Sequence, residues 1–408
     1  MHRVVITGMS GITALGNSWS TIKPRLQQLQ NAVVTMPEWA EIKGLDTRLA
    51  APVHGFEPPA HYTRHQLRAM GRVSRLSAVA TEKALDAAGL LGSPALTNGS
   101  TGIAYGTSTG STDAVREFAM MFLEKDTRNI TATTYVRMMP HTAAANVGLF
   151  FGIRGRLIPT SSACTSGSQA IGYAYEAIKH GYQDIMLAGG GEELCVSEAV
   201  VFDTVFATSQ QNDAPKTTPR PFDKARDGLV IGEGAATLVL ENHEHAKARG
   251  AKILGEIIAF STNCDATHIT QPNQETIQRC LQNALDQARL APRNIDFISA
   301  HGTATDRGDI AESHATHAIF GPGIRIASLK SYLGHTLGAC GSIEAWLTLE
   351  MMRDGWFAPT INLTNPDPAC AELDHLTGTG RTFDAEFIMT NNFAFGGVNT
   401  SLIIQRWS

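Results

Sequence analysis

The 408-residue sequence lacks the features of a membrane, secreted or nucleic-acid-binding protein. No apolar run reaches the roughly 18 residues that a membrane-spanning helix needs. The stretch from Met1 to Gly8 holds too few apolar residues for a secretory signal. Basic residues are not in excess, since the formal net charge is -5, and this argues against nucleic-acid binding. These absences predict a cytoplasmic protein.

Cysteine pairs at the C-x-x-C spacing of structural zinc sites are also absent. Two histidine pairs, His314-x-x-His317 and His243-x-His245, have charged neighbours that are typical of solvated faces. We therefore expect no metal site. Without a secretory signal we expect the cysteines to be reduced thiols. The six cysteines are Cys164, Cys195, Cys264, Cys280, Cys340 and Cys370.

The composition is that of a folded globular chain, with 43% hydrophobic and 17% charged residues. Short β-branched runs alternate with helical patterns, which predicts an α/β fold with largely parallel sheets. The charged segment 241–256 indicates a surface connection, so we expect two halves, residues 1–250 and 251–408. The strand-like runs include 4–7, 102–105, 185–188, 235–240 and 295–299, and the helical patterns include 67–89, 113–125 and 276–289.

Cys164 stands among small residues directly before a helical pattern. Ile171, Ala174, Tyr175 and Ile178 follow at the spacing of one apolar helix face. A cysteine at a helix N-terminus lies near the positive end of the helix dipole, which favours the thiolate. Cys164 is therefore a candidate nucleophile, with a buried structural cysteine as the alternative.

Two histidines each lie close to a glycine, at the end of a predicted strand or the start of a helical pattern. His301 follows the run 295–299, and His335 precedes an apolar helical pattern. Strand ends in α/β folds are where sites form, and a histidine near a helix N-terminus tends to stay neutral. Two neutral imidazoles could each donate an N–H to one enolate oxygen. The alternative is a pair of hydrogen-bonded structural histidines.

Four ordered motifs resemble the signature of the β-ketoacyl-acyl-carrier-protein synthases. They are Ser-Ala-Cys-Thr-Ser-Gly at 162–167, His-Gly-Thr-Ala-Thr at 301–305, Lys-Ser-Tyr-Leu-Gly-His at 330–335 and Asn-Phe-Ala-Phe-Gly-Gly-Val-Asn at 392–399. Segments 220–228 and 232–234 match as well, and 188–195 looks closest to the bacterial type I elongation synthases. The resemblance implies a thiolase fold with two similar halves in five layers, αβαβα. It also implies a homodimer, and a heterodimer with a related subunit stays open.

The resemblance assigns catalytic roles to single residues. Cys164 would carry the acyl group, and His301 and His335 would assist decarboxylation and stabilise the enolate. Lys330 would support the site electrostatically, paired with Glu344. An acyl group would move from a carrier thioester to the cysteine, and a malonyl thioester would then lose carbon dioxide and attack it. The implied partner is an acyl carrier protein, and this reaction requires no metal or organic cofactor.

Binding roles also follow from the resemblance. The backbone N–H groups of the nucleophile and of Phe395 would form an oxyanion hole. Thr303 and Thr305 would face the pantetheine arm, and Thr109 would face the acyl chain. Phe202 would line the acyl tunnel, with ordinary core packing as the alternative.

Two departures from the family pattern lie near the expected acyl and gating surfaces. Residues 332–334 are Tyr-Leu-Gly where the family commonly has Met-Thr-Gly, and Ala394 stands where the family commonly has glycine. Alanine adopts positive φ less freely than glycine, so we expect Ala394 to bias the gating loop. The usual fatty-acid substrate is therefore in doubt, and a dedicated polyene or other secondary acyl pathway stays open.

A basic stripe is the candidate docking surface for the carrier. Arg64, Arg68, Arg72 and Arg75 have the spacing of one helical face. Acyl carrier proteins are typically acidic, so this stripe could steer their approach, above all through Arg64 and Arg68. Ion pairs of these arginines with acidic groups elsewhere are the alternative.

Three rival interpretations remain at this point. The run Gly-Thr-Ser-Thr-Gly at 106–110 matches the G-x-S-x-G elbow of a serine hydrolase, with Ser108 as its nucleophile. A thiolase would use a second cysteine, for which Cys340 or Cys370 could serve. A non-catalytic partner subunit of a heterodimeric synthase would generally lack the nucleophile, and Cys164 is present.

Overall fold

The computed structural model describes residues 1–408 and contains one 11-stranded sheet. It consists of two five-stranded parts of the same topology, called here the N-terminal and C-terminal sheets, and β13 (Asp374–His375) pairs with the outer edge of the second. The strand order is β5-β4-β6-β8-β1 in the N-terminal sheet and β11-β10-β15-β16-β9 in the C-terminal sheet. Each order runs through two parallel and then two antiparallel pairings. The strands are β1 (Val4–Thr13), β4 (Thr101–Gly106), β5 (Leu157–Thr160), β6 (Ile185–Glu192), β8 (Gly234–Asn242), β9 (Gly255–Cys264), β10 (Phe297–Ser299), β11 (Arg325–Ala327), β15 (Phe387–Ala394) and β16 (Val398–Arg406).

The two sheets are joined along one edge. β1 and β9 pair antiparallel over three residues, with Val4 opposite Ile257, Val5 opposite Glu256 and Ile6 opposite Gly255. A boundary between residues 250 and 251 would fall between α9 (His243–Ala248) and β9, and it stays a prediction.

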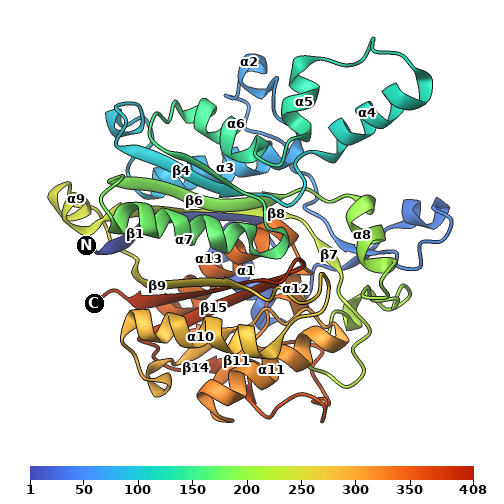
Figure 1. The fold of residues 1–408 in the computed structure, drawn as a ribbon, viewed down its shortest axis with the longest axis vertical. Coiled ribbons are helices and arrows are strands. Elements are labelled where there is room, and N and C mark those ends of the chain that lie inside the picture. Colours follow the sequence, from blue (N-terminus) through green and yellow to red (C-terminus); the bar gives the residue numbers. More distant parts are fainter.

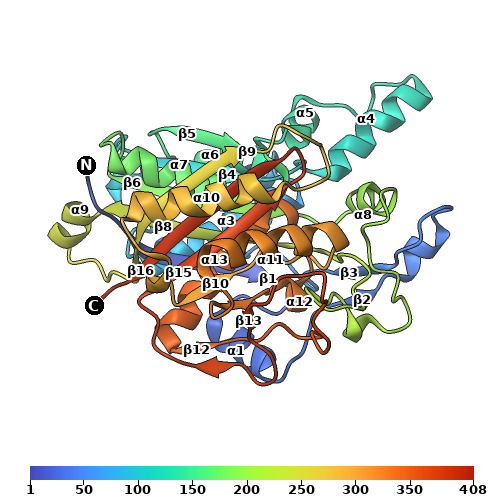
Figure 2. The same cartoon turned by 60° about the horizontal axis from the view of Figure 1, so that its bottom comes forward.

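Helices and sheets alternate in five layers (Figure 1). α3 and α6 cover the outer face of the N-terminal sheet, α7 and α13 lie between the sheets, and α10 and α11 cover the outer face of the C-terminal sheet (Figures 1 and 2). The predicted duplicated five-layer arrangement is therefore confirmed. These helices are α3 (Arg72–Ala87), α6 (Thr142–Phe151), α7 (Ser166–Lys179), α10 (Gln274–Ala288), α11 (Asp306–Phe320) and α13 (Cys340–Asp354).

The central helices α7 and α13 meet closely at their N-terminal ends. α13 is buried along most of its length, as expected for a helix with apolar or small residues on every side. A Cβ atom at Gly167 would lie 3.0 Å from the backbone nitrogen of Ser342, and one at Gly341 would lie 2.6 Å from that of Ser168. The two glycines therefore allow the two helix starts to approach each other, and both candidate catalytic segments lie there.

Smaller elements surround this frame. α4 and α5 form an arm that projects from the upper half in Figure 1. No helix is long and apolar enough to cross a membrane. The remaining helices are α1 (Trp19–Gln27), α2 (Arg64–Leu67), α4 (Thr112–Glu124), α5 (Ala132–Met138), α8 (Val196–Asp203) and α12 (Lys330–Leu333). The remaining strands are β2 (Val34–Thr35), β3 (Leu49–Ala51), β7 (Ile231–Gly232), β12 (Trp356–Phe357), β13 (Asp374–His375) and β14 (Arg381–Thr382).

The structure corrects two expectations about the sheets. They are not largely parallel, because the antiparallel strands β8 and β16 lie inside each sheet. The strand-like run 185–188 is also longer than predicted, because β6 continues through Gly189–Gly191 to Glu192. A Cβ at Gly189 would lie 2.2 Å from the carbonyl oxygen of Ala236, and one at Gly190 would lie 2.6 Å from that of Gly338. The glycines therefore serve close packing inside the sheet.

The basic stripe does not lie on one helix. The helical pattern 67–89 is interrupted, because α2 ends at Leu67 and α3 begins at Arg72. Gly71 separates them in an extended conformation, and a Cβ there would lie 1.7 Å from the Ser111 hydroxyl. Arg72 pairs with the buried Glu233. The single helical face is therefore wrong, and only Arg64 and Arg68 are exposed without an ion pair.

Candidate active site

Cys164 lies in a sharp turn that leads into α7. The turn is a single 3-10 turn, Ala163–Thr165, and Ala163 has a φ of +49°. Left-handed φ values are unfavourable for alanine, so packing around the turn has to maintain this conformation. Cys164 is 3% exposed. The predicted position of the cysteine at the start of a helix is confirmed.

Both predicted histidines meet at this cysteine. His335 Nε2 lies 2.9 Å from Cys164 Sγ, and the His301 and His335 rings are 5.2 Å apart, edge to face. The backbone of His335 is held by β7, since its N–H donates to Val230 and its carbonyl accepts from Gly232. Residues from three distant segments of the sequence therefore converge on one sulfur atom.

Lys330 fixes the tautomer of His301. The Lys330 ammonium lies 3.2 Å from His301 Nδ1 and forms an ion pair with Glu344, as the sequence analysis predicted for this pair. The Asn392 amide donates to Glu344 and lies 3.5 Å from the same Nδ1. An ammonium group is only a donor, so Nδ1 accepts and the His301 proton is on Nε2. Nε2–H is thus the ring's free donor.

The charge states differ in one respect from the sequence-based expectation. Burial raises the pKa of the Cys164 thiol to about 12, although Lys330 and the backbone N–H groups of Phe395 and Cys164 oppose this rise. Burial therefore opposes the thiolate that the helix dipole and the free backbone N–H groups were expected to favour. Burial and the charge of Lys330 lower the pKa of His301 and His335 well below the usual histidine range. Both rings are neutral, as expected, but burial is the main cause.

Lys330 keeps its charge inside the protein. Burial works against the ammonium form, but the Glu344 carboxylate outweighs this and raises the pKa of Lys330. Removal of one partner of such a buried pair leaves an uncompensated charge, which typically costs about 3–5 kcal/mol. The pair therefore holds a fixed positive charge beside the two neutral imidazoles.

The sequence analysis did not predict that three further residues, Glu312, Cys340 and Asn392, support the catalytic side chains. Both oxygens of the buried Glu312, on α11, accept backbone N–H groups, one from His301 and one from Gly302. Cys340 Sγ donates to the carbonyl oxygen of Cys164, and Asn392 binds Glu344. None of these contacts follows a local sequence pattern, because each partner is distant in the sequence.

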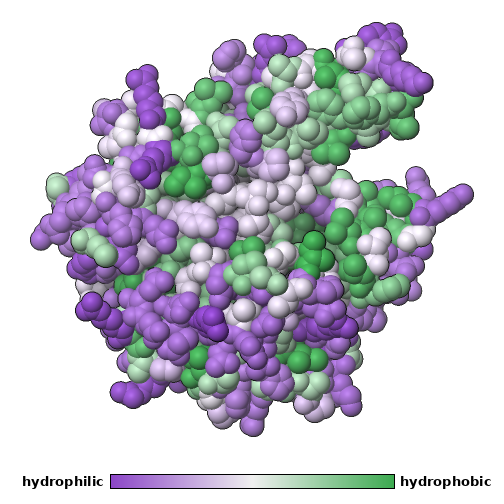
Figure 3. All heavy atoms as spheres, viewed as in Figure 1, coloured by the Kyte–Doolittle hydropathy of each residue, from purple (hydrophilic) through white to green (hydrophobic).

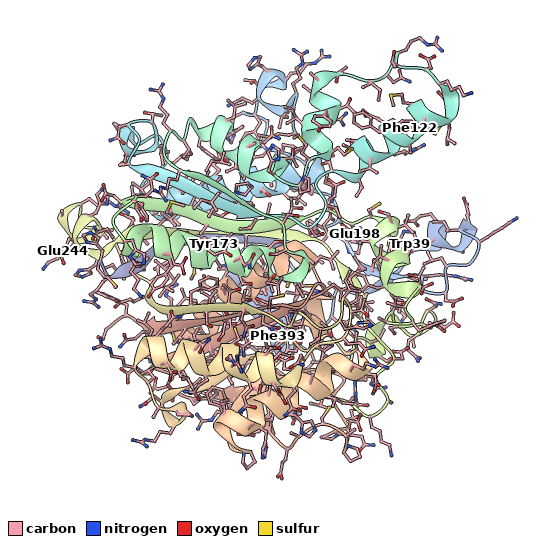
Figure 4. All side chains as sticks on the ribbon, in the orientation of Figure 1. Trp39, Phe122, Tyr173, Glu198, Glu244 and Phe393 are labelled. Carbon is pink, nitrogen blue, oxygen red and sulfur yellow. The ribbon has the colours of Figure 1, made fainter.

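A cavity of about 520 Å³ leads from Cys164 to the surface. Thr303 and Thr305 line it, with their hydroxyl groups 2.9 Å apart. Phe202 and Phe395 also line it, and their rings pack 5.0 Å apart. Figure 4 marks Phe393, whose ring lies edge to face against His301 at 5.8 Å. The cavity thus contains most of the residues to which the sequence analysis gave binding roles.

The position of Thr109 and the backbone conformation of Ala394 differ from those that the sequence analysis predicted. Thr109 does not line this cavity, and its hydroxyl lies 3.4 Å from the Glu198 carboxyl instead. Ala394 lines the cavity but ends β15 without a positive φ; the left-handed positions in this loop are Gly396 and Gly397. In this conformation alanine therefore causes no backbone strain at position 394.

The contacts of the rival nucleophile, Ser108, and of the rival second cysteines do not support a catalytic role for them. The backbone N–H of Ser108 donates to the buried Glu192, and no histidine contacts Ser108. This excludes a Ser-His pair of the kind that a serine hydrolase uses. Cys340 lies behind the Cys164 carbonyl, and Cys370 does not line the cavity.

The nucleophile and the two histidines could also be considered as metal ligands. One sulfur and two imidazole nitrogens lie within 4.8 Å of one another, and zinc accepts such a donor set. However, the Lys330 ammonium lies beside His301 and disfavours a second cation. The short contact between Cys164 and His335 is a hydrogen bond between two of the three would-be ligands. The donor set therefore fits acid–base and nucleophilic chemistry better than metal binding.

Comparisons with known proteins agree with this geometry. Residues 1–246 match the β-ketoacyl synthase N-terminal domain, and residues 254–364 match the β-ketoacyl synthase C-terminal domain. The 3-oxoacyl-[acyl-carrier-protein] synthase 2 of Vibrio harveyi is 33% identical over 99% of both chains. The corresponding synthase 1 of Haemophilus influenzae is 34% identical over 100% of both chains. This chain therefore belongs to the β-ketoacyl synthase family.

Solved structures of the family have the same fold. A β-ketoacyl synthase from Burkholderia phymatum STM815 is 56% identical, with a TM-score of 0.99 over 100% of both chains. A type II polyketide ketosynthase, solved with its acyl-carrier protein and a bound hexaketide, is 27% identical, with a TM-score of 0.88 over 100% of both chains. The predicted thiolase fold is confirmed. Synthases named 1 and 2 match almost equally, so these identities do not separate the two subclasses.

Proposed function

We propose that this chain is a β-ketoacyl-acyl-carrier-protein synthase. It condenses an acyl group held on Cys164 with the two-carbon unit of a malonyl thioester. One observation carries the proposal: Cys164 Sγ, His301 and His335 converge within 4.8 Å at the inner end of one cavity. A nucleophile and two neutral imidazoles at one point are what the two half-reactions require.

In the first half-reaction the acyl group moves from the carrier to the enzyme. Cys164 attacks the thioester carbonyl and gives its proton to His335 Nε2, which lies 2.9 Å from the sulfur. The carbonyl oxygen becomes negative and accepts the N–H groups of Cys164 and Phe395, both of which act on the sulfur in the resting site. The carrier thiolate then leaves and takes the proton from His335.

In the second half-reaction a malonyl thioester enters along Thr303 and Thr305. Its carboxylate leaves as carbon dioxide, and the bonding electrons form an enolate. His301 donates from Nε2, because Lys330 and Asn392 occupy Nδ1 as donors. His335 donates the second N–H from Nε2, after exchange with solvent has moved its ring proton from Nδ1 to Nε2. The enolate carbon attacks the acyl carbonyl, the Cys164 thiolate departs, and one proton from solvent restores the thiol.

The carrier protein is the partner that this chemistry requires. Arg64 and Arg68 are exposed and unpaired, and together with His65 they line one shallow depression. An acidic carrier fits such a patch, because opposite charges steer encounter and hold contacts at the rim. This docking role applies to Arg64 and Arg68 only, since Arg72 is engaged with Glu233.

A second copy of the chain is the proposed occupant of the upper right-hand surface. Apolar atoms gather on the arm and, across an indentation, on the lobe that holds α8 (Figure 3). β5 is the edge strand of the N-terminal sheet, so its outer backbone groups are free to pair. Homodimerisation would cover both features, and size-exclusion chromatography with light scattering tests it. We also expect this protein to be located in the cytoplasm. The exposed apolar side chains are Val115, Met120, Phe122, Leu123, Tyr135, Leu149, Leu157, Val201, Val205 and Phe206.

Reconstitution with labelled substrate tests the proposed reaction. The protein is incubated with an acyl carrier thioester and a malonyl carrier thioester that is ¹³C-labelled in its free carboxyl group. We expect one labelled carbon dioxide for each β-ketoacyl product. The matched control is Cys264→Ala, which removes an exposed cysteine and should leave turnover unchanged. Release of free acid without a β-ketoacyl product would refute the proposal.

A further inference from the structure

A second cavity lies between the end of β1, helix α1, the segment 53–59 and α3. Its volume is about 580 Å³, and it shares no lining residue with the cavity at Cys164. Small-molecule sites in proteins typically have volumes of about 300–1,000 Å³. The second cavity is therefore large enough for a ligand of its own, and the proposed reaction makes no use of it.

Two cationic side chains line this cavity without an acidic partner. Arg25 donates one guanidinium N–H to a backbone carbonyl and forms no ion pair. Lys83 is half-buried, and the neighbouring Glu82 carboxylate is hydrogen-bonded to His61 and Tyr62 instead. Burial lowers the pKa of Lys83, although the charge of Glu82 opposes this change. An anion in the cavity would therefore stabilise both cations.

One acidic side chain also lines the cavity. Glu57 is exposed, and its carboxylate acts on Arg72, whose guanidinium pairs with Glu233. Arg25 and Lys83 thus outnumber the acidic groups of the cavity, which leaves a net positive charge there. A singly charged anion fits this balance better than a dianion, because the second negative charge would meet Glu57 without a third cation to offset it.

Apolar side chains supply much of the remaining wall. Ile12, Val53 and Val79 are buried, and Phe56 is half-buried. A cavity with cationic and apolar walls fits a ligand with an anionic end and an apolar part. We propose that the second cavity binds an alkyl carboxylate, with the carboxylate at the two cationic side chains and the alkyl chain on the apolar wall.

Calorimetric titration with four small molecules tests the class of ligand. Octanoate has both the charge and the alkyl chain, acetate has only the charge, and octanamide has the chain with a neutral head group. Inorganic phosphate is an anion of a different class. At low ionic strength we expect octanoate to bind the wild-type protein roughly 10-fold or more tightly than each of the others, because each of them lacks one of the two interactions.

Variants and chemical labelling locate the bound octanoate. Lys83→Met and Arg25→Met remove one charge each, and each should weaken octanoate binding by roughly 10-fold, the usual effect of losing a hydrogen bond to a charged group. Lys43→Met, at an exposed position outside the cavity, is the matched control and should bind octanoate as the wild type does. Octanoate should also slow the acetylation of Lys83 by N-hydroxysulfosuccinimide acetate, followed by peptide mapping, and leave that of Lys43 unchanged.

Three results would contradict the inference. Unchanged octanoate affinity in both variants overturns it, and so does acetylation of Lys83 at the full rate in saturating octanoate. Binding of inorganic phosphate as tightly as octanoate overturns the proposed class of ligand. None of these results affects the proposed function, because acylation of Cys164 takes place in the other cavity.

Discussion

A single 3-10 turn precedes the central helix in each half of the molecule, but only one of the two turns carries a catalytic side chain. Before α7, Ala163 has a φ of +49° and opens a single 3-10 turn; before α13, Leu337 does the same at +43°. The next position is Cys164 in the first turn and Gly338 in the second. The duplicated backbone thus offers two equivalent places for a nucleophile, and only one of them carries a reactive side chain.

Packing explains the glycine. The Gly338 N–H donates to the buried Glu192, and a Cβ there would lie 2.7 Å from that carboxyl and 2.6 Å from the Ser108 nitrogen. The second turn therefore has no room for a side chain. The C-terminal half instead contributes His335, which lies two residues before this turn. The first half supplies the sulfur and the second supplies the imidazoles, so neither half is sufficient alone.

The largest effect should come from the first turn. Cys164→Ala removes the proposed acceptor and should abolish acylation and lower condensation by about 10⁴-fold or more, as for other covalent catalysts without their nucleophile. Intact-mass analysis after incubation with acyl carrier protein measures it. A persistent acyl adduct on the variant, or one on Ser108, would contradict the division between the halves.

The histidines should separate the two half-reactions. His301 does not contact the sulfur, so His301→Ala should keep most acylation but lose about 10²–10³-fold in malonyl decarboxylation, as typical for loss of one oxyanion donor. His335→Ala should slow both steps, because its Nε2 lies 2.9 Å from Cys164 Sγ. Equal acylation defects in the two variants, measured by rapid quench, would remove this distinction.

The protonation state of the thiol gives a pH prediction. Because burial raises the Cys164 pKa to about 12, the thiolate fraction increases with pH throughout the neutral and mildly alkaline range. Alkylation of Cys164 by iodoacetamide should therefore rise about tenfold per pH unit, without a plateau at neutral pH. Peptide mapping identifies the modified cysteine. A rate that is flat from neutral to alkaline pH would instead indicate a preformed thiolate paired with His335.

The second turn should be sensitive to a single methyl group. Gly338→Ala places a Cβ against Glu192 and Ser108, and overpacking of this kind typically costs about 1–3 kcal/mol. Urea unfolding measures the loss. Gly323→Ala is the control, since Gly323 has neither a positive φ nor a heavy atom within 4 Å of the added carbon. Equal stability of the two variants would show that the second turn tolerates a side chain.

The smallest effect should lie at the surface. Charge reversal of Arg64 and Arg68 should raise the KM for carrier-bound substrate several-fold and weaken its salt dependence, because rim charges act mainly on encounter. Turnover of a pantetheine thioester should barely change, since it needs no protein docking. Equal losses with both substrates would exclude this patch.

The sequence predicted the reactive residues well because their motifs are local. Cys164, His301, Lys330 and His335 each lie in a short segment whose residues resemble those of a known family, and the structure brings them together. Glu312 went unnoticed because it acts through backbone N–H groups of a segment ten residues away. Its carboxyl has no partner that a periodic pattern would reveal.

Helix boundaries are also hard to predict from the sequence where they depend on residues from a distant part of the chain. Periodicity joined α2 to α3, because the residues between them do not break the pattern strongly enough in sequence. The break depends on Ser111, which lies against Gly71 from a distant part of the chain. The two helix-start turns were not recognised as equivalent either, since their residues differ and only their backbone angles agree.

The pairing of β1 with β9 has the symmetry of a contact between two identical subunits. Val5 lies opposite Glu256, and the pairing extends by one residue on each side. A pseudo-two-fold axis therefore passes between Val5 and Glu256, perpendicular to the two strands. An isologous dimer interface has this property, because the same patch meets itself across the axis. The two halves of this chain are thus arranged like the two subunits of an isologous dimer, although they carry different side chains at equivalent positions such as Cys164 and Gly338.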